Sequence, residues 1–207
     1  MPAAYPTFVR PCRPVRAIRP PSDDAWIHEP KLDGHRLQIV KFGRQVKLYS
    51  ECGYDWSSRL PRLAEALTTI PCQAAVIDSE LCSLSEDDVP DFNNASGAAR
   101  SGWEHEVAVF AFDLLHRSGM DLRPLPLLER RRHLTHLIAR GNVPCLRVLE
   151  CFSDGEKLLA TAERQSLEGI VSKRRAAPYH SGDCCDWVTT KTEAWRTANR
   201  ERWRLFG

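Results

Sequence analysis

Apolar and polar residues alternate along several short segments of the chain, and this alternation predicts strands. The clearest pair covers residues 37–42 and 46–49, on either side of Gly43-Arg44. Two alternating segments around a short glycine-containing turn are typical of a β-hairpin. We predict further strands at residues 74–81, 107–115, 146–149, 169–173 and 186–191.

Helical spacing of apolar residues predicts four helices, over residues 59–70, 127–140, 153–165 and 195–206. In the first, apolar residues follow Leu60 at intervals of three and four. The second is basic and ends at Gly141. In the third, Ser153 precedes Glu156 by three residues, which predicts a capping box at the start of the helix.

The order of these elements predicts the fold class. Hairpins and helices are mixed without regular β-α-β alternation, which favours an α+β domain with antiparallel sheets. Residues 1–24 contain prolines at 2, 6, 11, 14, 20 and 21, so no regular helix forms there. We therefore predict an extended N-terminal strap over 1–24 and one domain over 25–207. Residues 85–102 are rich in Asp, Asn, Ser and Gly and predict a loop.

Composition narrows the class of protein. Apolar residues make up 43% and charged residues 27%, as in an ordinary globular protein. No run approaches the roughly eighteen apolar residues of a membrane span, and the N-terminus has no apolar secretory segment. We expect a cytoplasmic protein with no membrane partner. None of the eight cysteines forms a C-x-x-C pair, so we expect reduced thiols rather than a zinc site.

The net charge of only +2 hides an uneven distribution. Arginines cluster in the first twenty residues, between 117 and 140, and after Trp187, whereas acidic residues gather between Asp78 and Asp91. Such segregation suits a protein with one phosphate-facing side, although charged runs are also typical of ordinary solvated faces. We predict DNA-backbone contacts from Arg130, Arg131 and Arg132 and from the helix over 195–206.

The strongest candidate for chemistry is the string E-P-K-L-D-G-H-R at residues 29–36. Lysine is a poor nucleophile near neutral pH because its unperturbed pKa is about 10.4, but a cation, a metal ion or desolvation lowers that pKa. Gly34 permits a tight backbone turn, and Arg36 can hold a phosphate through a bidentate fork. The string alone thus allows a Lys31 that attacks phosphorus, but by itself it favours the other interpretation, a plain surface turn.

Four further strings accompany K-x-D-G-x-R, which resembles motif I of the covalent nucleotidyltransferases: DNA ligases, RNA ligases and mRNA capping enzymes. V-I-D-S-E-L (76–81) resembles the strand that carries the nucleotide-contacting glutamate, and F-D-L-L-x-x-x-G-x-D-L-R (112–123) resembles motif III of DNA ligases. E-G-I-V-S-K (168–173) and D-W-V-T-T-K (186–191) resemble motifs IV and V. The resemblance covers 26–191 and is closest to bacterial ATP-dependent DNA ligases of the end-joining type.

The resemblance implies a fold: an α+β nucleotidyltransferase domain of the ligase and capping-enzyme type, with flanking helices and an ATP groove between two antiparallel sheets. It also implies an activity, the sealing of 5′-phosphate nicks in DNA through a covalent lysyl-AMP intermediate. ATP and Mg²⁺ or Mn²⁺ would be the cofactors, and nicked double-stranded DNA the partner. The protein would then be bacterial and associated with the nucleoid.

Residue roles follow from the same resemblance. Lys31 would attack the α-phosphorus of ATP, and Lys191 and Arg36 would complete the catalytic set, with Lys191 supplying positive charge at the α-phosphate. Five residues would contact the nucleotide. Glu29 would lie at the adenine edge, Phe112 would stack on adenine and Glu80 would lie at the ribose. The other two are Glu168 and Lys173. Glu80 and Glu168 would also position the metal ion. A plain core phenylalanine is the alternative for Phe112, and an exposed strand-edge pair is the alternative for Glu168 and Lys173.

Three departures from the family pattern predict weakened catalysis. The first lysine position of motif V is Thr189, and Glu51 stands where the family often has an arginine. The residues after Lys191 are too few for the OB-fold domain that normally follows in DNA ligases. The chain is thus either part of a longer ligase or, as its C-terminal helix favours, a stand-alone adenylation domain for which a separate OB-fold or repair protein would act in trans. These departures keep a second interpretation open, a weakened ligase homologue that binds DNA or a repair partner. A third is an RNA ligase or capping guanylyltransferase.

Overall fold

The computed structural model describes residues 6–84 and 107–200. The strands are β1 (Cys12–Ala17), β2 (Trp26–Lys31), β3 (His35–Phe42), β4 (Gln45–Ser50), β5 (Ala74–Ser83), β6 (Val107–Arg117), β7 (Met120–Asp121), β8 (Leu146–Val148), β9 (Gly169–Arg174) and β10 (Gly182–Lys191). The helices are α1 (Pro61–Leu67), α3 (Leu127–Ala139), α4 (Gly155–Arg164) and α5 (Glu193–Ala198). The predicted loop over 85–102 lies outside the described residues, as does the end of the helix predicted over 195–206.

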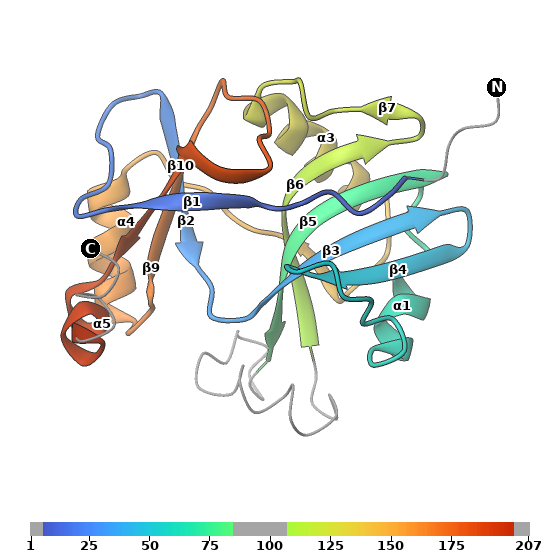
Figure 1. The fold of residues 1–207 in the computed structure, drawn as a ribbon, viewed down its shortest axis with the longest axis horizontal. Coiled ribbons are helices and arrows are strands. Elements are labelled where there is room, and N and C mark those ends of the chain that lie inside the picture. The colour runs from blue at the N-terminus through green and yellow to red at the C-terminus, as the bar shows by residue number, and fades with distance from the viewer. Residues whose placement is uncertain (1–5, 85–106, 201–207) are drawn as a thin grey trace.

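Two sheets stand side by side, as Figure 1 shows, and the chain crosses between them after β2. The smaller has the order β1-β10-β9-β2; the larger has the order β4-β3-β5-β6-β7, with β8 beside β6. The predicted α+β class and the hairpin of β3 and β4 are confirmed. The prediction of purely antiparallel sheets is wrong, because β1 pairs with β10, and β8 with β6, in parallel.

Each parallel pair has a physical reason. Parallel neighbours require a long crossover rather than a tight turn. Helix α3 is that crossover between β6 and β8, and it packs against both strands. From residue 6 on, the segment before β2 is extended, as predicted, and its β1 forms an edge strand of the smaller sheet. Pro14 lies at a register shift of this edge strand, where a missing backbone N–H is tolerated.

Strand β2, which carries Lys31 at its end, is absent from the predicted elements. Its sequence W-I-H-E-P-K does not alternate, because the first four side chains are all buried. Helix α4 packs against β2 and β9 and covers this edge of the sheet. A strand that is covered on both faces loses the period-two pattern that reveals other strands.

The predicted helices are confirmed in position and differ at their ends. Helix α4 begins at Gly155, two residues later than predicted, and its N-cap is Asp154, whose carboxylate accepts from the Lys157 backbone N–H at 2.9 Å. The predicted capping box from Ser153 is therefore wrong, since the adjacent Asp takes that role. Helix α5 begins earlier than predicted, at Glu193, with Thr192 as its N-cap.

The hydrophobic core forms two main clusters. One lies between the larger sheet and the helices α1 and α3 and contains Leu37, Ile77 and Leu134. The other joins the two sheets through Phe112 on β6 and Trp187 on β10. This second cluster fixes how the sheets face each other and so shapes the space between them.

Arg130 is part of the interior and has no exposed surface. Its Nε and Nη2 donate to the two carboxylate oxygens of Asp113 at 2.8 Å each, and Nη1 donates to the carbonyls of Leu125 and Ala177. The prediction that Arg130 contacts DNA is therefore wrong. Arg131 is also buried, whereas Arg132 is exposed and its DNA contact stays a prediction.

The buried pair predicts a large stability loss for Asp113→Ala. This change leaves the Arg130 guanidinium buried without a carboxylate, which costs about 3–5 kcal/mol. Asp121→Ala is the matched control, because Asp121 binds Arg123 with the same bidentate geometry at 2.8 and 2.7 Å but at the surface. Such exposed pairs contribute about 1 kcal/mol or less. Urea unfolding of the two variants measures both losses, and equal losses would contradict this account of the core.

Candidate active site

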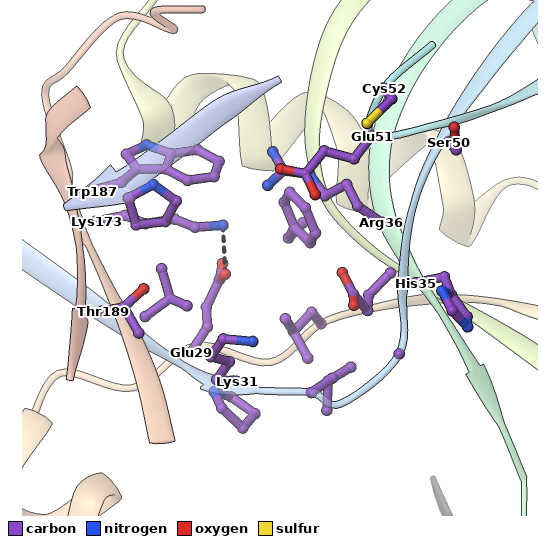
Figure 2. A pocket seen from close by; sticks show the side chains of 18 of the residues that line it. Glu29, Lys31, His35, Arg36, Ser50, Glu51, Cys52, Lys173, Trp187 and Thr189 are labelled. Carbon is purple, nitrogen blue, oxygen red and sulfur yellow. Dashed lines mark ion pairs between the residues drawn. The ribbon is translucent and has the colours of Figure 1, made fainter. Parts of the chain in front are cut away.

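A cavity of about 540 Å³ lies between the two sheets and takes its walls from both. Figure 2 shows Glu29, Lys31, Lys173, Trp187 and Thr189 on one side and Arg36 and Glu51 on the other. The first group comes from β2, β9 and β10 of the smaller sheet. The second comes from β3 and the turn after β4 of the larger sheet. Pockets of this size accommodate nucleotides and other small ligands.

Lys31 is the last residue of β2 and lines the cavity with 30% of its side chain exposed. Its ammonium forms an ion pair with one carboxylate oxygen of Glu168, and Lys191 forms an ion pair with the other oxygen. The sheet register explains this arrangement, because Lys31 on β2 and Lys191 on β10 both face Gly169 on β9. One carboxylate thus holds two lysines together at the edge of the cavity.

Two glycines of the motifs are required by close backbone contacts. A Cβ at Gly169 would lie 2.2 Å from the carbonyl oxygen of Thr190, so another side chain would push β9 and β10 apart. A Cβ at Gly34 would lie 2.4 Å from the carbonyl oxygen of Leu81. The predicted role of Gly34 in permitting a tight turn is therefore better stated as permitting close contact between the β2–β3 link and β5.

Glu29 is a second carboxylate that holds two cations. One oxygen accepts from Nη1 of Arg131, and the other lies 2.5 Å from the ammonium of Lys173. Both Glu29 and Lys173 are almost completely buried. Burial lowers the pKa of the Lys173 ammonium, whereas the charge of Glu29 opposes that change. The predicted DNA contact of Arg131 is wrong, because its guanidinium points inward to Glu29.

Aromatic rings form the wall behind Lys173. The ammonium lies 4.1 Å from the ring centroid of Phe112 and 3.9 Å from that of Trp187. These cation–π contacts offset part of the cost of burying the charge. Phe112 both lines the cavity and belongs to the core, with 6% exposure. Adenine stacking on Phe112 therefore stays a prediction, and the sequence did not single out Trp187 as a site residue despite its place in motif V.

Arg36 reaches the cavity from β3, but one edge of its guanidinium is already occupied. Its Nε and Nη2 donate to the two oxygens of Asp78 at 2.8 and 2.7 Å. Tyr179 donates its hydroxyl to the same carboxylate at 2.7 Å. The predicted bidentate grip on a phosphate cannot use this edge, so any phosphate contact must come from the remaining N–H groups. Asp78 was missed as its partner, although it lies two residues before Glu80 on the same face of β5.

Glu80 faces the cavity from β5. Burial raises the pKa of its carboxyl to about 7, while Lys31 and Arg36 act in the opposite direction. Its partner in the predicted metal site, Glu168, has both oxygens in ion pairs with lysines and does not line the cavity. Within 6–84 and 107–200, no three His, Cys, Asp or Glu side chains form a metal-binding group.

The two substituted motif positions both lie on the cavity wall. Glu51 follows β4 and is exposed, and Thr189 lies on β10 opposite Val171. The structure therefore brings together Lys31, Glu29, Glu80, Phe112, Lys173 and Arg36 around one cavity, with Glu168 and Lys191 behind Lys31. Among the described helices, none is long and apolar enough to cross a membrane.

The raised pKa of Glu80 predicts a pH dependence of stability in the metal-free and nucleotide-free protein. Its ordinary value is 4.5 and its folded value is about 7, so the folded state binds more protons between these values. The contribution of Glu80 is thus fully present below about pH 4.5 and is lost as the pH rises through 7. Glu80→Gln should flatten this part of the curve of unfolding free energy against pH from 5 to 8. An unchanged curve would contradict the assignment.

Comparison with known proteins places this site in a family. The model of the ATP dependent DNA ligase domain matches residues 6–191. The multifunctional non-homologous end joining protein LigD of Pseudomonas aeruginosa is 34% identical over 189 residues, covering 91% of this chain and 22% of that protein. DNA ligase B of Mycobacterium tuberculosis is 33% identical over 165 residues, covering 75% and 32%. The chain thus spans less than a third of the length of either relative.

A solved structure shows the same arrangement of elements. A mycobacterial DNA ligase D complexed with ATP and MES superposes with a TM-score of 0.76 at 28% identity, covering 87% of this chain and 59% of that one. The ATP-dependent DNA ligase of bacteriophage T7, at 17% identity and a TM-score of 0.62, shares the fold over 89% of this chain and 69% of that one. The predicted nucleotidyltransferase fold is confirmed, and the chain belongs to the ATP-dependent DNA ligase domain family.

Proposed function

We propose that this chain is the adenylation domain of an ATP-dependent DNA ligase and that Lys31 takes AMP from ATP. The observation that carries this proposal is the position of Lys31, in contact with Glu168 at the edge of a nucleotide-sized cavity between two sheets. Several cationic side chains surround or line this cavity, as binding of a triphosphate requires. The solved relative whose printed title includes ATP has the same fold.

In the proposed step, the Lys31 nitrogen attacks the α-phosphorus of ATP. A nitrogen–phosphorus bond forms, the bond from the α-phosphorus to the bridging oxygen breaks, and pyrophosphate leaves with the bonding electrons. The ammonium proton must leave before or during the attack, and Glu168 is the carboxylate in contact with it. Lys191, on the other oxygen of Glu168, brings a fixed positive charge to the α-phosphate as negative charge accumulates there.

The base would occupy the part of the cavity that Phe112 and Glu29 line. An aromatic ring offers a flat apolar surface to adenine. Glu29 presents carboxylate oxygens, which accept hydrogen bonds and so suit the exocyclic amino group of adenine. The Lys173 ammonium binds one oxygen of Glu29, and Arg131 binds the other.

A divalent cation fits part of the predicted metal site. Mg²⁺ typically binds one or two carboxylates together with substrate phosphates and water, so it does not need a cage of three protein ligands. Glu80 lines the cavity and is the carboxylate that would hold it. Glu168 fits poorly as a ligand because two lysines occupy its oxygens. The bound ion would neutralise phosphate charge and polarise the α-phosphorus.

We further propose nicked double-stranded DNA as the polynucleotide substrate, because the matching family is the ATP dependent DNA ligase domain and one named relative is DNA ligase B. After the first step, AMP would pass from Lys31 to a 5′-phosphate, and a 3′-hydroxyl would then displace AMP. The exposed Arg132 on α3 stays a candidate for backbone contact. An OB-fold domain or a repair protein would complete the enclosure of the nick.

The first prediction from this proposal concerns the nucleophile. Incubation with ATP and Mg²⁺ should add the mass of one adenylyl group to the intact protein, and Lys31→Ala should lose the addition because no amine faces the α-phosphorus. Lys157→Ala is the control, since Lys157 is an exposed lysine on α4. An adduct that persists in Lys31→Ala would contradict the assignment. Salt-dependent DNA binding without any adduct in the unaltered protein would favour the weakened, DNA-binding homologue.

The second prediction concerns the acidic substitution on the cavity wall. Glu51→Arg should raise the rate of AMP transfer to Lys31 by about tenfold or more, because a cation replaces an anion beside the phosphates. Glu65→Arg makes the same charge change on the exposed face of α1, away from the cavity, and should leave the rate within about twofold. Quenched-flow mass measurements supply both rates. A slower Glu51→Arg variant would show instead that this carboxylate assists the reaction.

A further inference from the structure

Arg131 makes contacts that its neighbour Arg130 does not. Its Nη1 donates to a carboxylate oxygen of Glu29 and, at 3.0 Å, to the backbone carbonyl of Phe112. Its Nη2 donates to the backbone carbonyl of Leu149 at 2.6 Å. Glu29, Phe112 and Leu149 come from three distant parts of the chain, and all three line the cavity. One buried guanidinium therefore ties three parts of the cavity wall together.

The neighbouring arginine shows that this arrangement is not needed to anchor the helix. Arg130 already fastens α3 to β6 through the two oxygens of Asp113 and to two backbone carbonyls. Arg130 does not line the cavity, and its partner Asp113 does not line it either. The two adjacent arginines thus have different roles. Arg130 anchors α3 in the core, whereas Arg131 binds residues that line the cavity.

The contacts of Glu29 leave it able to bind a further donor. Arg131 takes one oxygen and Lys173 the other, but each carboxylate oxygen can accept two hydrogen bonds. As a carboxylate, Glu29 offers acceptors only. Its orientation is set from both sides, which reduces the entropy lost when a ligand donates to it.

We propose that Arg131 is a positioning residue for base recognition: it fixes the Glu29 carboxylate and the Phe112 backbone so that Glu29 accepts from the exocyclic amino group of a purine. This inference rests on the proposed function, because adenine is taken as the base in the cavity. Without the guanidinium, Glu29 turns toward Lys173 and two buried carbonyls lose a donor. The amino group then loses a well-placed acceptor, whereas the rest of the nucleotide keeps its contacts.

The test compares ATP with purine riboside triphosphate, which lacks the 6-amino group. Equilibrium binding is measured in a Lys31→Ala background, so that AMP transfer does not affect the result. A hydrogen bond to a charged acceptor contributes enough to give about tenfold or more preference for ATP when Arg131 is present. Arg131→Gln and Arg131→Lys should reduce that preference to about threefold or less. Arg140→Gln, an exposed change at the C-cap of the same helix, should keep it.

The outcomes separate positioning from simple structural support. If Arg131 only supports the fold, both variants weaken the two nucleotides equally and the preference is unchanged, which overturns the inference. Absence of ATP binding in the Lys31→Ala protein with Arg131 present also overturns it. If Arg131→Gln fails to fold, Arg131→Lys decides, because it keeps the charge and a donor. The proposed function is tested separately. If the Arg131 variants lose the preference for ATP but the protein with Lys31 intact forms no AMP adduct, the inference is supported and the proposed function is contradicted.

Discussion

The site depends on two carboxylates that each hold two cations. Glu29 binds Arg131 and Lys173, and Glu168 binds Lys31 and Lys191. Removing four cations from bulk water beside one cavity is costly unless each has an anionic partner. The two glutamates supply these partners and leave the two clusters with a net positive charge, whereas Glu51 and Glu80 add negative charge to the facing wall of the cavity.

Strand register produces this arrangement. On the smaller sheet, β9 lies between β2 and β10, and its Gly169 faces both Lys31 and Lys191. Four positions along β9, Lys173 faces Trp187 on β10. A shift of one residue in either pairing would turn these side chains to the opposite face of the sheet. The register of these three strands therefore brings the motifs together at two positions along β9: Lys31 and Lys191 meet at Gly169, and Trp187 meets Lys173.

Much of the fold and of the site could be predicted from the sequence, and the failures share a cause. Alternation revealed the hairpin of β3 and β4, whereas β2 was missed because α4 covers it and all of its first four side chains are buried. Charge alone does not reveal burial, so Arg130 and Arg131 were assigned to the DNA surface although Asp113 and Glu29 hold them inside. The resemblance indicated which residues meet, but their pairing required coordinates. Asp78 as the partner of Arg36 is one such case.

The central claim is that the cavity between the sheets holds ATP with its α-phosphate at Lys31. A crystal structure of the protein with ATP, grown without a divalent cation, tests this most directly. The account predicts adenine beside Phe112 and Glu29, and the α-phosphorus within reach of the Lys31 nitrogen. Density for ATP outside this cavity, or with the adenine and phosphates exchanged so that Lys31 meets the base, would contradict it.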